Sequence, residues 1–154
     1  ICRRCRIQKK RVTRRSPEAT SFAGWKDPEK FADILTADHM IIAERNPKNQ
    51  SRKCFKHAMV IQDYKSKWLR PHPSLTKSAA DATAGVQNCL GPNIVPVVVS
   101  TDNSGELINA MKNIKALHAT AMPHLPQSNG VVENSIRRVK EGTRCLMHQS
   151  GLSH

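Results

Sequence analysis

The chain has 154 residues and a formal net charge of +13. It contains no apolar run near the ~20 residues of a membrane span, and its basic first residues lack the apolar stretch of a signal peptide. The charge therefore indicates a polyanionic partner, and we expect nucleic acid and no membrane. Because the sequence begins with Ile1 rather than Met, we expect a piece of a longer polypeptide.

The basic charge is concentrated at the N-terminus. Residues 1–15 hold eight cations and no acid, whereas the remaining sequence holds 17 cations (25 minus 8) and 12 acids. This arm contains Cys2-x2-Cys5, a spacing that suits two thiolates on one zinc ion, but no matching Cys/His pair follows, so it is at most half a site. We expect 16–30 to be a linker and 31–154 a compact domain. Five widely spaced cysteines also favour a reducing compartment.

The first half of the domain predicts three strands. "FADILTADHMIIA" (31–43) has the apolar density and alternation of a strand, and "CFKHAMVIQDY" (54–64) predicts a second. "KWLRPHP" (67–73) predicts a short third strand that is ended by its two prolines. Because short turns connect them, an antiparallel meander is the most economical arrangement.

A helix and a buried strand are expected next. "SLTKSAADATAGVQNCLG" (74–91) predicts a helix that Ser74 or Thr76 caps and Gly91 ends. "IVPVVVSTD" (94–102) is a continuous apolar run, as expected of a buried strand.

The last part of the chain predicts two helices around a weak strand. "SGELINAMKNIKA" (104–116) is a short helix candidate, "ALHATAM" (116–122) a weak strand and "PHLPQSNG" (123–130) a loop. The final helix is expected from about Gly130 to Met147. Its buried stripe would consist of Val132, Ile136, Val139, Thr143 and Leu146. These elements together predict an α/β sheet with helices on its faces.

Three of the 12 acids lie where a site would place them. Asp38 lies in the first predicted strand, Asp102 ends the apolar run and Glu133 opens the last helix. An acid at the end of a buried strand is often part of a site, because ligands bind at strand ends in open α/β sheets. Each acid alone also has a structural explanation, as an outward edge-strand residue, a turn or N-cap residue, and a helix-dipole partner respectively.

Two blocks of sequence resemble the catalytic core of retroviral and retrotransposon integrases. They are "STDNSGEL" (100–107) and "MPHLPQSNGVVENSIRRVKEGTRCLM" (122–147), which match the patterns TDN-x-GE, P-x-x-PQSNGVVE and E-x-x-x-RxxxExxRxLM. The spacing of Glu141, Arg144 and the following Leu-Met looks closest to copia-type elements. "CRRCRIQKK" looks like the second half of the family's N-terminal His-His-Cys-Cys zinc module. The resemblance covers nearly the whole chain and is strongest in 99–147.

The resemblance implies a ribonuclease-H-like fold, with a mixed central sheet of an antiparallel three-strand meander plus parallel strands, flanked by helices. It implies Asp38, Asp102 and Glu133 as catalytic residues that hold two Mg²⁺ or Mn²⁺ ions. It also implies a zinc ion at Cys2 and Cys5 in the full-length protein. Asp33 is the alternative first acid, but its odd offset from Asp38 places it on the opposite strand face, and we prefer Asp38 because the apolar run and hairpin continue after it.

The implied reaction is 3′-end processing of retroelement DNA and its transfer into target DNA, by a homo-oligomer in the nucleus or in a cytoplasmic, intracellular virus-like particle. The implied DNA contacts are Arg137, Lys140, Arg138 and Arg144 in the last helix and Gln127 and Asn129 in the preceding loop. A solvated helix face with i,i+4 ion pairs is the alternative for the cations.

Two other interpretations of the whole chain stay open. It could be an inactive integrase relic that only binds DNA, or an unrelated basic nucleic-acid-binding module whose acids are structural. The segment between Asp102 and Glu133 is a few residues shorter than the family usually shows, and the shortening falls in 107–118. The geometry of the three acids therefore decides between the interpretations.

Overall fold

The computed structural model describes residues 28–42, 53–120 and 126–151, and in these ranges it leaves the side chains of residues 120 and 126–129 undescribed. The basic arm with Cys2 and Cys5 lies outside the described residues. Among the described helices, none combines the length and the apolar character that a membrane-spanning helix requires.

The centre of the fold is one five-stranded mixed sheet with the strand order β3-β2-β1-β4-β5. The first three strands pair antiparallel as the expected meander, and β4 and β5 run parallel to β1. The carboxyl ends of β1, β4 and β5 therefore meet at the same edge of the sheet. The strands are β1 Ile34–Ile41, β2 His57–Asp63, β3 Leu69–Ser74, β4 Val98–Thr101 and β5 Leu117–Thr120.

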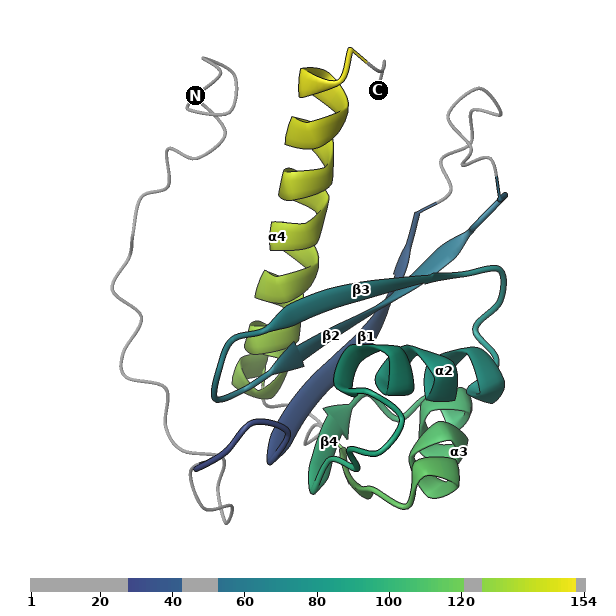
Figure 1. Cartoon of the computed structure of the whole chain (residues 1–154), viewed down its shortest axis with the longest axis vertical. Helices are drawn as coiled ribbons and strands as arrows, with labels where there is room; N and C mark the ends of the chain where they lie inside the picture. Colours follow the sequence, from purple (N-terminus) through teal and green to yellow (C-terminus); the bar gives the residue numbers. More distant parts are fainter. Residues whose placement is uncertain (1–27, 43–52, 121–125, 152–154) are drawn as a thin grey trace.

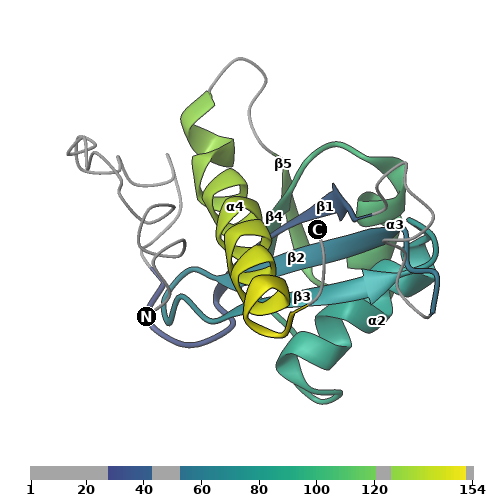
Figure 2. The ribbon, with the colours of Figure 1, turned by 90° about the horizontal axis from the view of Figure 1, so that it is seen from above.

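Three helices flank this sheet: α2 (Ala79–Leu90), α3 (Gly105–Ile114) and α4 (Pro126–Gln149). Figures 1 and 2 show α2 and α3 on one face and α4 on the other. The main apolar core lies between the sheet and the first two of these helices. Its largest fully buried members are Leu35, Met59, Ile61, Val86, Val99, Leu107 and Met111.

The third strand begins two residues later than predicted, at Leu69, and its prolines do not end it. It continues through both prolines to Ser74, with Pro71 opposite Val60 and Pro73 opposite Ala58. The reason is its place in the sheet: β3 is an edge strand, where a residue without an N–H group leaves no partner unpaired.

The cap of α2 also differs from the prediction. Neither Ser74 nor Thr76 caps the helix; the N-cap is Ser78, whose Oγ accepts a hydrogen bond of 3.1 Å from the Asp81 amide. Thr76 instead hydrogen-bonds to the Asp81 carboxylate. The predicted end is confirmed, because Gly91 adopts φ +96° and its N–H bonds to the carbonyl oxygen of the last turn.

The apolar run before Asp102 forms a shorter strand than predicted. Only Val98–Thr101 are paired, and Ile94, Val95 and Val97 are exposed. The pairing with β1 starts with Val98 opposite Ile34, and upstream of it the Val97 backbone still hydrogen-bonds to the Ala32 carbonyl oxygen and the Leu117 amide.

The segment after Asp102 keeps a full helix despite its shortness. Helix α3 has ten residues, with Ser104 at its N-cap in an extended conformation (φ −70°). It ends at Lys115 in the left-handed region, and the chain then enters β5 as predicted. The parallel β4–α3–β5 unit is therefore complete.

The last helix begins earlier than predicted. It starts at Pro126 rather than near Gly130, so part of the expected loop is helical, and proline is well suited to a first helical turn. The predicted buried stripe is confirmed only in part: Val132 is buried, whereas Thr143 and Leu146 are exposed. The C-terminal half of α4 runs beyond the strands in Figure 1, so it has no sheet to pack against.

Candidate active site

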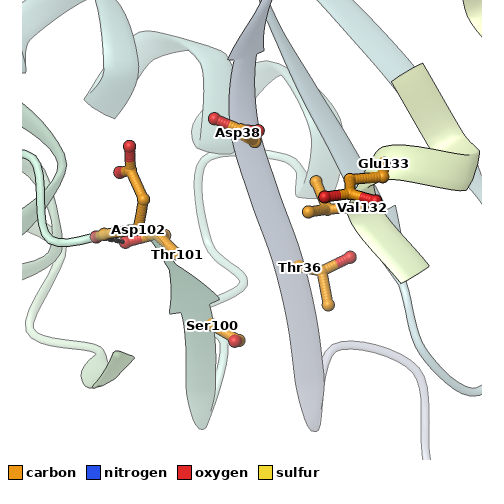
Figure 3. Close-up of a pocket in the computed structure, with 7 residues that line it drawn as sticks. All are labelled: Thr36, Asp38, Ser100, Thr101, Asp102, Val132 and Glu133. Atoms are coloured by element: carbon orange, nitrogen blue, oxygen red, sulfur yellow. Dashed lines mark hydrogen bonds between the residues drawn. The ribbon is translucent and has the colours of Figure 1, made fainter. Parts of the chain in front are cut away.

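The three predicted acids line one pocket, as Figure 3 shows. Asp38 comes from β1, Asp102 follows the last residue of β4, and Glu133 lies in α4. The pocket has a volume of about 50 Å³. Its lining residues are Thr36, Asp38, Ser100, Thr101, Asp102, Val132 and Glu133.

The period of β1 explains why Asp38 faces the pocket. Leu35 and Ala37 are fully buried in the core under α2 and α3, so Thr36 and Asp38 point to the opposite face. Asp33, the alternative acid, is not in the strand at all. Its Oδ2 accepts hydrogen bonds from the amides of residues 29 and 30, at 2.8 and 2.7 Å, which makes it a turn residue.

Asp38 is half-buried, and its ionised form is disfavoured. Burial raises the pKa of its carboxyl above the ordinary 3.8, and the negative charges of Asp102 and Glu133 raise this pKa further. A hydrogen bond from the His39 amide (2.7 Å) and the charge of Lys77 act in the opposite direction. The pocket is therefore a place where negative charge accumulates and where a cation would be favoured.

Asp102 is exposed at the end of β4. Its Oδ1 accepts a hydrogen bond of 3.2 Å from the Ser104 amide, so it also has the turn role that its position alone suggested. The preceding Thr101 donates its hydroxyl to the Asp102 carbonyl oxygen (2.7 Å) and is hydrogen-bonded to Nε2 of His118 in β5 (2.6 Å). Burial lowers the pKa of His118, which favours its neutral form beside Thr101.

Glu133 is exposed at the pocket, and its neighbours on α4 hold the helix to the sheet. Val132 retains 8% of its surface and Ser135 none. The Ser135 hydroxyl donates to Oε1 of Gln62, a residue of β2. Glu133 therefore projects from the docked half of α4.

The donor set suits a hard divalent cation, because Mg²⁺ and Mn²⁺ prefer carboxylate oxygens. Nevertheless, in the described part of the chain no three His, Cys, Asp or Glu side chains are grouped closely enough to hold a metal ion as they stand. Two of the three pocket acids, Asp102 and Glu133, are exposed, where packing does not fix a rotamer. Ligation of a metal ion in this pocket would therefore require these carboxylates to converge.

The four predicted DNA-contacting cations of the last helix are all exposed on α4: Arg137, Arg138, Lys140 and Arg144. Arg137 and Lys140 follow Glu133 by four and seven residues, so they lie on the same helix face as this acid. Arg137 hydrogen-bonds to Asn134. The side chains of Gln127 and Asn129 lie outside the described residues, although their backbone belongs to α4.

Several residues around the pocket were not predicted from the sequence. Thr36 was detectable, because it lies two positions before Asp38 on the same strand face. Lys77 precedes the cap of α2, and its charge acts on Asp38 and His39. No local pattern links it to β1, so only the fold reveals this proximity.

Comparison with known proteins yields a structural match and no sequence match. No protein-family model and no curated protein matches the chain. A solved structure, the cryo-electron-microscopy structure of the simian T-cell lymphotropic virus intasome in complex with PP2A regulatory subunit B56 gamma, contains a chain that matches with a TM-score of 0.63 and 18% identity. The match covers 80% of this chain and 44% of that one, so the present chain spans less than half of its neighbour's length. The likeness shows the fold, and the predicted ribonuclease-H-like α/β class is confirmed.

Proposed function

We propose that the chain is the core of an integrase-type polynucleotidyl transferase, which processes the 3′ ends of retroelement DNA and joins them to target DNA. One observation carries this proposal: Asp38, Asp102 and Glu133, from three elements far apart in the sequence, line the same pocket. The intasome neighbour supports it at the level of the fold.

The acids would act as metal ligands. Two Mg²⁺ or Mn²⁺ ions, when bound, would supply activation of the attacking water or 3′-hydroxyl and stabilisation of the leaving oxygen. Asp38 is the most enclosed of the three acids, with a pKa raised by burial, so its carboxylate gains most from a neighbouring cation. Asp102 and Glu133 reach the pocket from its rim. No side chain is needed as a covalent nucleophile.

The basic face of α4 would hold DNA. Arg137 and Lys140 share the helix face of Glu133, so phosphates bound there would place the DNA end at the pocket. Such contacts give affinity and strong salt dependence but little sequence discrimination. The neighbouring structure is an intasome, which supports DNA as partner and a multimeric assembly for this chain too. A nuclear or virus-like-particle location and the zinc half site at Cys2 and Cys5 belong to the same proposal.

A second candidate is an inactive integrase relic that binds DNA without cleaving it. The observation in its favour is that the pocket acids of the described structure do not form a group that could hold a metal ion, while the α4 cations remain exposed. An unrelated basic module is less well supported, because it gives no reason for three acids around one pocket.

A strand-transfer and DNA-nicking assay with the full chain, short DNA duplexes and a supercoiled plasmid, in Mg²⁺ or Mn²⁺, tests the proposal. We expect metal-dependent products that Glu133→Gln lowers by at least about 100-fold, since even the outer partners of metal ligands are worth about 10- to 100-fold. Glu141→Gln is the matched control, because it changes an acid on the same helix away from the pocket.

The outcomes separate the candidates. Activity that survives Glu133→Gln contradicts the metal role. A wild-type chain that binds DNA but gives no product in either metal favours the relic.

A further inference from the structure

A buried polar contact joins α4 to the sheet, and the proposed reaction does not use it. Ser135 of α4 has no exposed surface, and Gln62 of β2 retains 4% of its surface. The Ser135 hydroxyl hydrogen-bonds to Oε1 of this glutamine and also lies 2.8 Å from the carbonyl oxygen of Val131, one helical turn back. Val60, two residues before Gln62, and Val132, three residues before Ser135, are buried as well.

The cost of such a contact makes its presence informative. A buried amide and a buried hydroxyl lose their hydration, and an apolar pair of similar shape would stabilise the interface at least as well. What a hydrogen bond adds is direction, since it is satisfied at only one rotation and one translation of α4 on the sheet. Apolar side chains such as Val132 tolerate a range of positions.

The contact is connected to the pocket on both sides. Ser135 lies two residues after Glu133 on α4. Gln62 is the cross-strand partner of Thr36 in β1, and its carbonyl oxygen lies 3.5 Å from the Thr36 hydroxyl. Thr36 lines the pocket, two residues before Asp38 on the same strand face. A single hydrogen-bonded connection thus joins the strand that carries one acid to the helix that carries another.

We propose that Ser135 and Gln62 are positioning residues, which fix the rotation of α4 so that Glu133 faces Asp38 across the pocket. The proposal rests on the proposed function for its catalytic consequence. The claim that this pair sets the position of Glu133 does not depend on catalytic activity and can be measured without it.

The test compares Mn²⁺ affinity and folding in a set of variants of the full chain. Mn²⁺ binding is followed by electron paramagnetic resonance, and the folded fraction by circular dichroism at the same temperature. We expect Ser135→Ala and Gln62→Leu to weaken Mn²⁺ binding by roughly 10-fold while the chains remain folded, which is the size seen for partners of metal ligands. Ser135→Thr keeps the hydroxyl and should restore most of the affinity.

Thr83→Ala is the matched control. The Thr83 hydroxyl makes the same kind of bond to a carbonyl oxygen one turn back (2.8 Å), but in α2 and away from the pocket. A purely structural role would lower the melting temperature in both alanine variants and leave Mn²⁺ affinity unchanged below the transition.

The failure of this inference is distinguishable from the failure of the proposed function. If Glu133→Gln abolishes Mn²⁺ binding but folded Ser135→Ala binds as the wild type does, the positioning role is overturned and the metal site stands. If the wild type binds no Mn²⁺, the proposed function fails. The positioning role is then decided by amide hydrogen exchange, and residues 131–139 exchanging equally in the wild type and Ser135→Ala would overturn it.

Discussion

On the face of the sheet that α2 and α3 cover, β1 contributes Leu35 and Ala37, whereas on the face that α4 covers it contributes Thr36 and Asp38. The first face is closed by a continuous apolar core. The second has buried polar side chains, an open pocket and a helix that is docked over only part of its length. Alternate residues of the same strand therefore have different roles: one set packs in the apolar core and the other lines the pocket.

The difference has a physical cost. Burial of apolar surface stabilises the fold by about 25 cal/mol per Å². Carboxylates that share a half-buried pocket repel one another and lose hydration, as the raised pKa of Asp38 indicates. Truncation of an apolar core residue and neutralisation of the half-buried pocket carboxylate should therefore change stability in opposite directions, and this contrast can be tested residue by residue.

The largest expected effect is on the apolar face. Leu107→Ala removes a fully buried side chain from the core between α3 and the sheet and should lower the free energy of unfolding by about 2–5 kcal/mol. That loss is a large part of the about 5–15 kcal/mol that a typical domain has. Urea unfolding followed by circular dichroism measures it. A loss under about 1 kcal/mol would mean that this face is not the main core.

A smaller effect is expected on DNA binding by the α4 face. The double variant Arg137→Ala, Lys140→Ala should weaken DNA binding and make the plot of log affinity against log salt shallower by about 2, since each phosphate contact contributes about 0.9 to the slope. Fluorescence anisotropy at several salt concentrations gives this slope. The control removes two exposed cations elsewhere, Lys65 and Lys112. An equal change in both double variants would show that only the net charge matters.

A modest gain in stability is expected at the pocket. The pKa of Asp38 is raised by burial, so in the folded chain its ionised form is destabilising once the pH exceeds the ordinary value of 3.8. Asp38→Asn should therefore raise the melting temperature at pH 7 in the absence of metal. The gain should shrink as the pH falls through the folded-state pKa and vanish below 3.8.

The control for that gain is Asp33→Asn, a nearby acid whose carboxylate accepts two backbone hydrogen bonds and which should show no stabilisation. Equal melting temperatures for Asp38→Asn and the wild type at pH 7 would contradict the claim that the ionised Asp38 carboxylate destabilises the fold.

The smallest effect is expected at the unpacked end of α4. Leu146 is 68% exposed, so Leu146→Ala should change the free energy of unfolding by no more than about 0.5 kcal/mol. The same chemical change at Leu107 is the direct comparison. A large loss at Leu146 would mean that the C-terminal half of α4 is packed in solution, for example against a second copy of the chain.

Much of the fold could be predicted because local patterns matched it. The alternation in 34–41, the glycine at 91 and the position of Asp102 directly after a buried strand all led to correct elements. The errors have a common cause. Ile94, Val95 and Leu146 are apolar by sequence, but their burial depends on whether another element lies opposite them, and none does among the described residues.

The acids of the candidate site could be predicted from the sequence, but the contact that holds α4 to the sheet beside them could not. Motif resemblance indicated Asp102 and Glu133, and Asp38 was preferred to Asp33 because the apolar run and the hairpin continue directly after it. The contact of Ser135 with Gln62 joins residues 73 positions apart, so neither local sequence nor spacing could reveal it. A polar residue in the apolar run of β2 was the one available signal.

The most direct test of the central claim is a crystal structure of the full chain grown with Mn²⁺, with data collected to locate manganese by anomalous scattering. We expect anomalous peaks in the pocket, with carboxylate oxygens of Asp38, Asp102 and Glu133 as ligands and two ions about 3.5–4 Å apart. A structure at saturating Mn²⁺ with no peak in this pocket, and with the three carboxylates still apart, would contradict it.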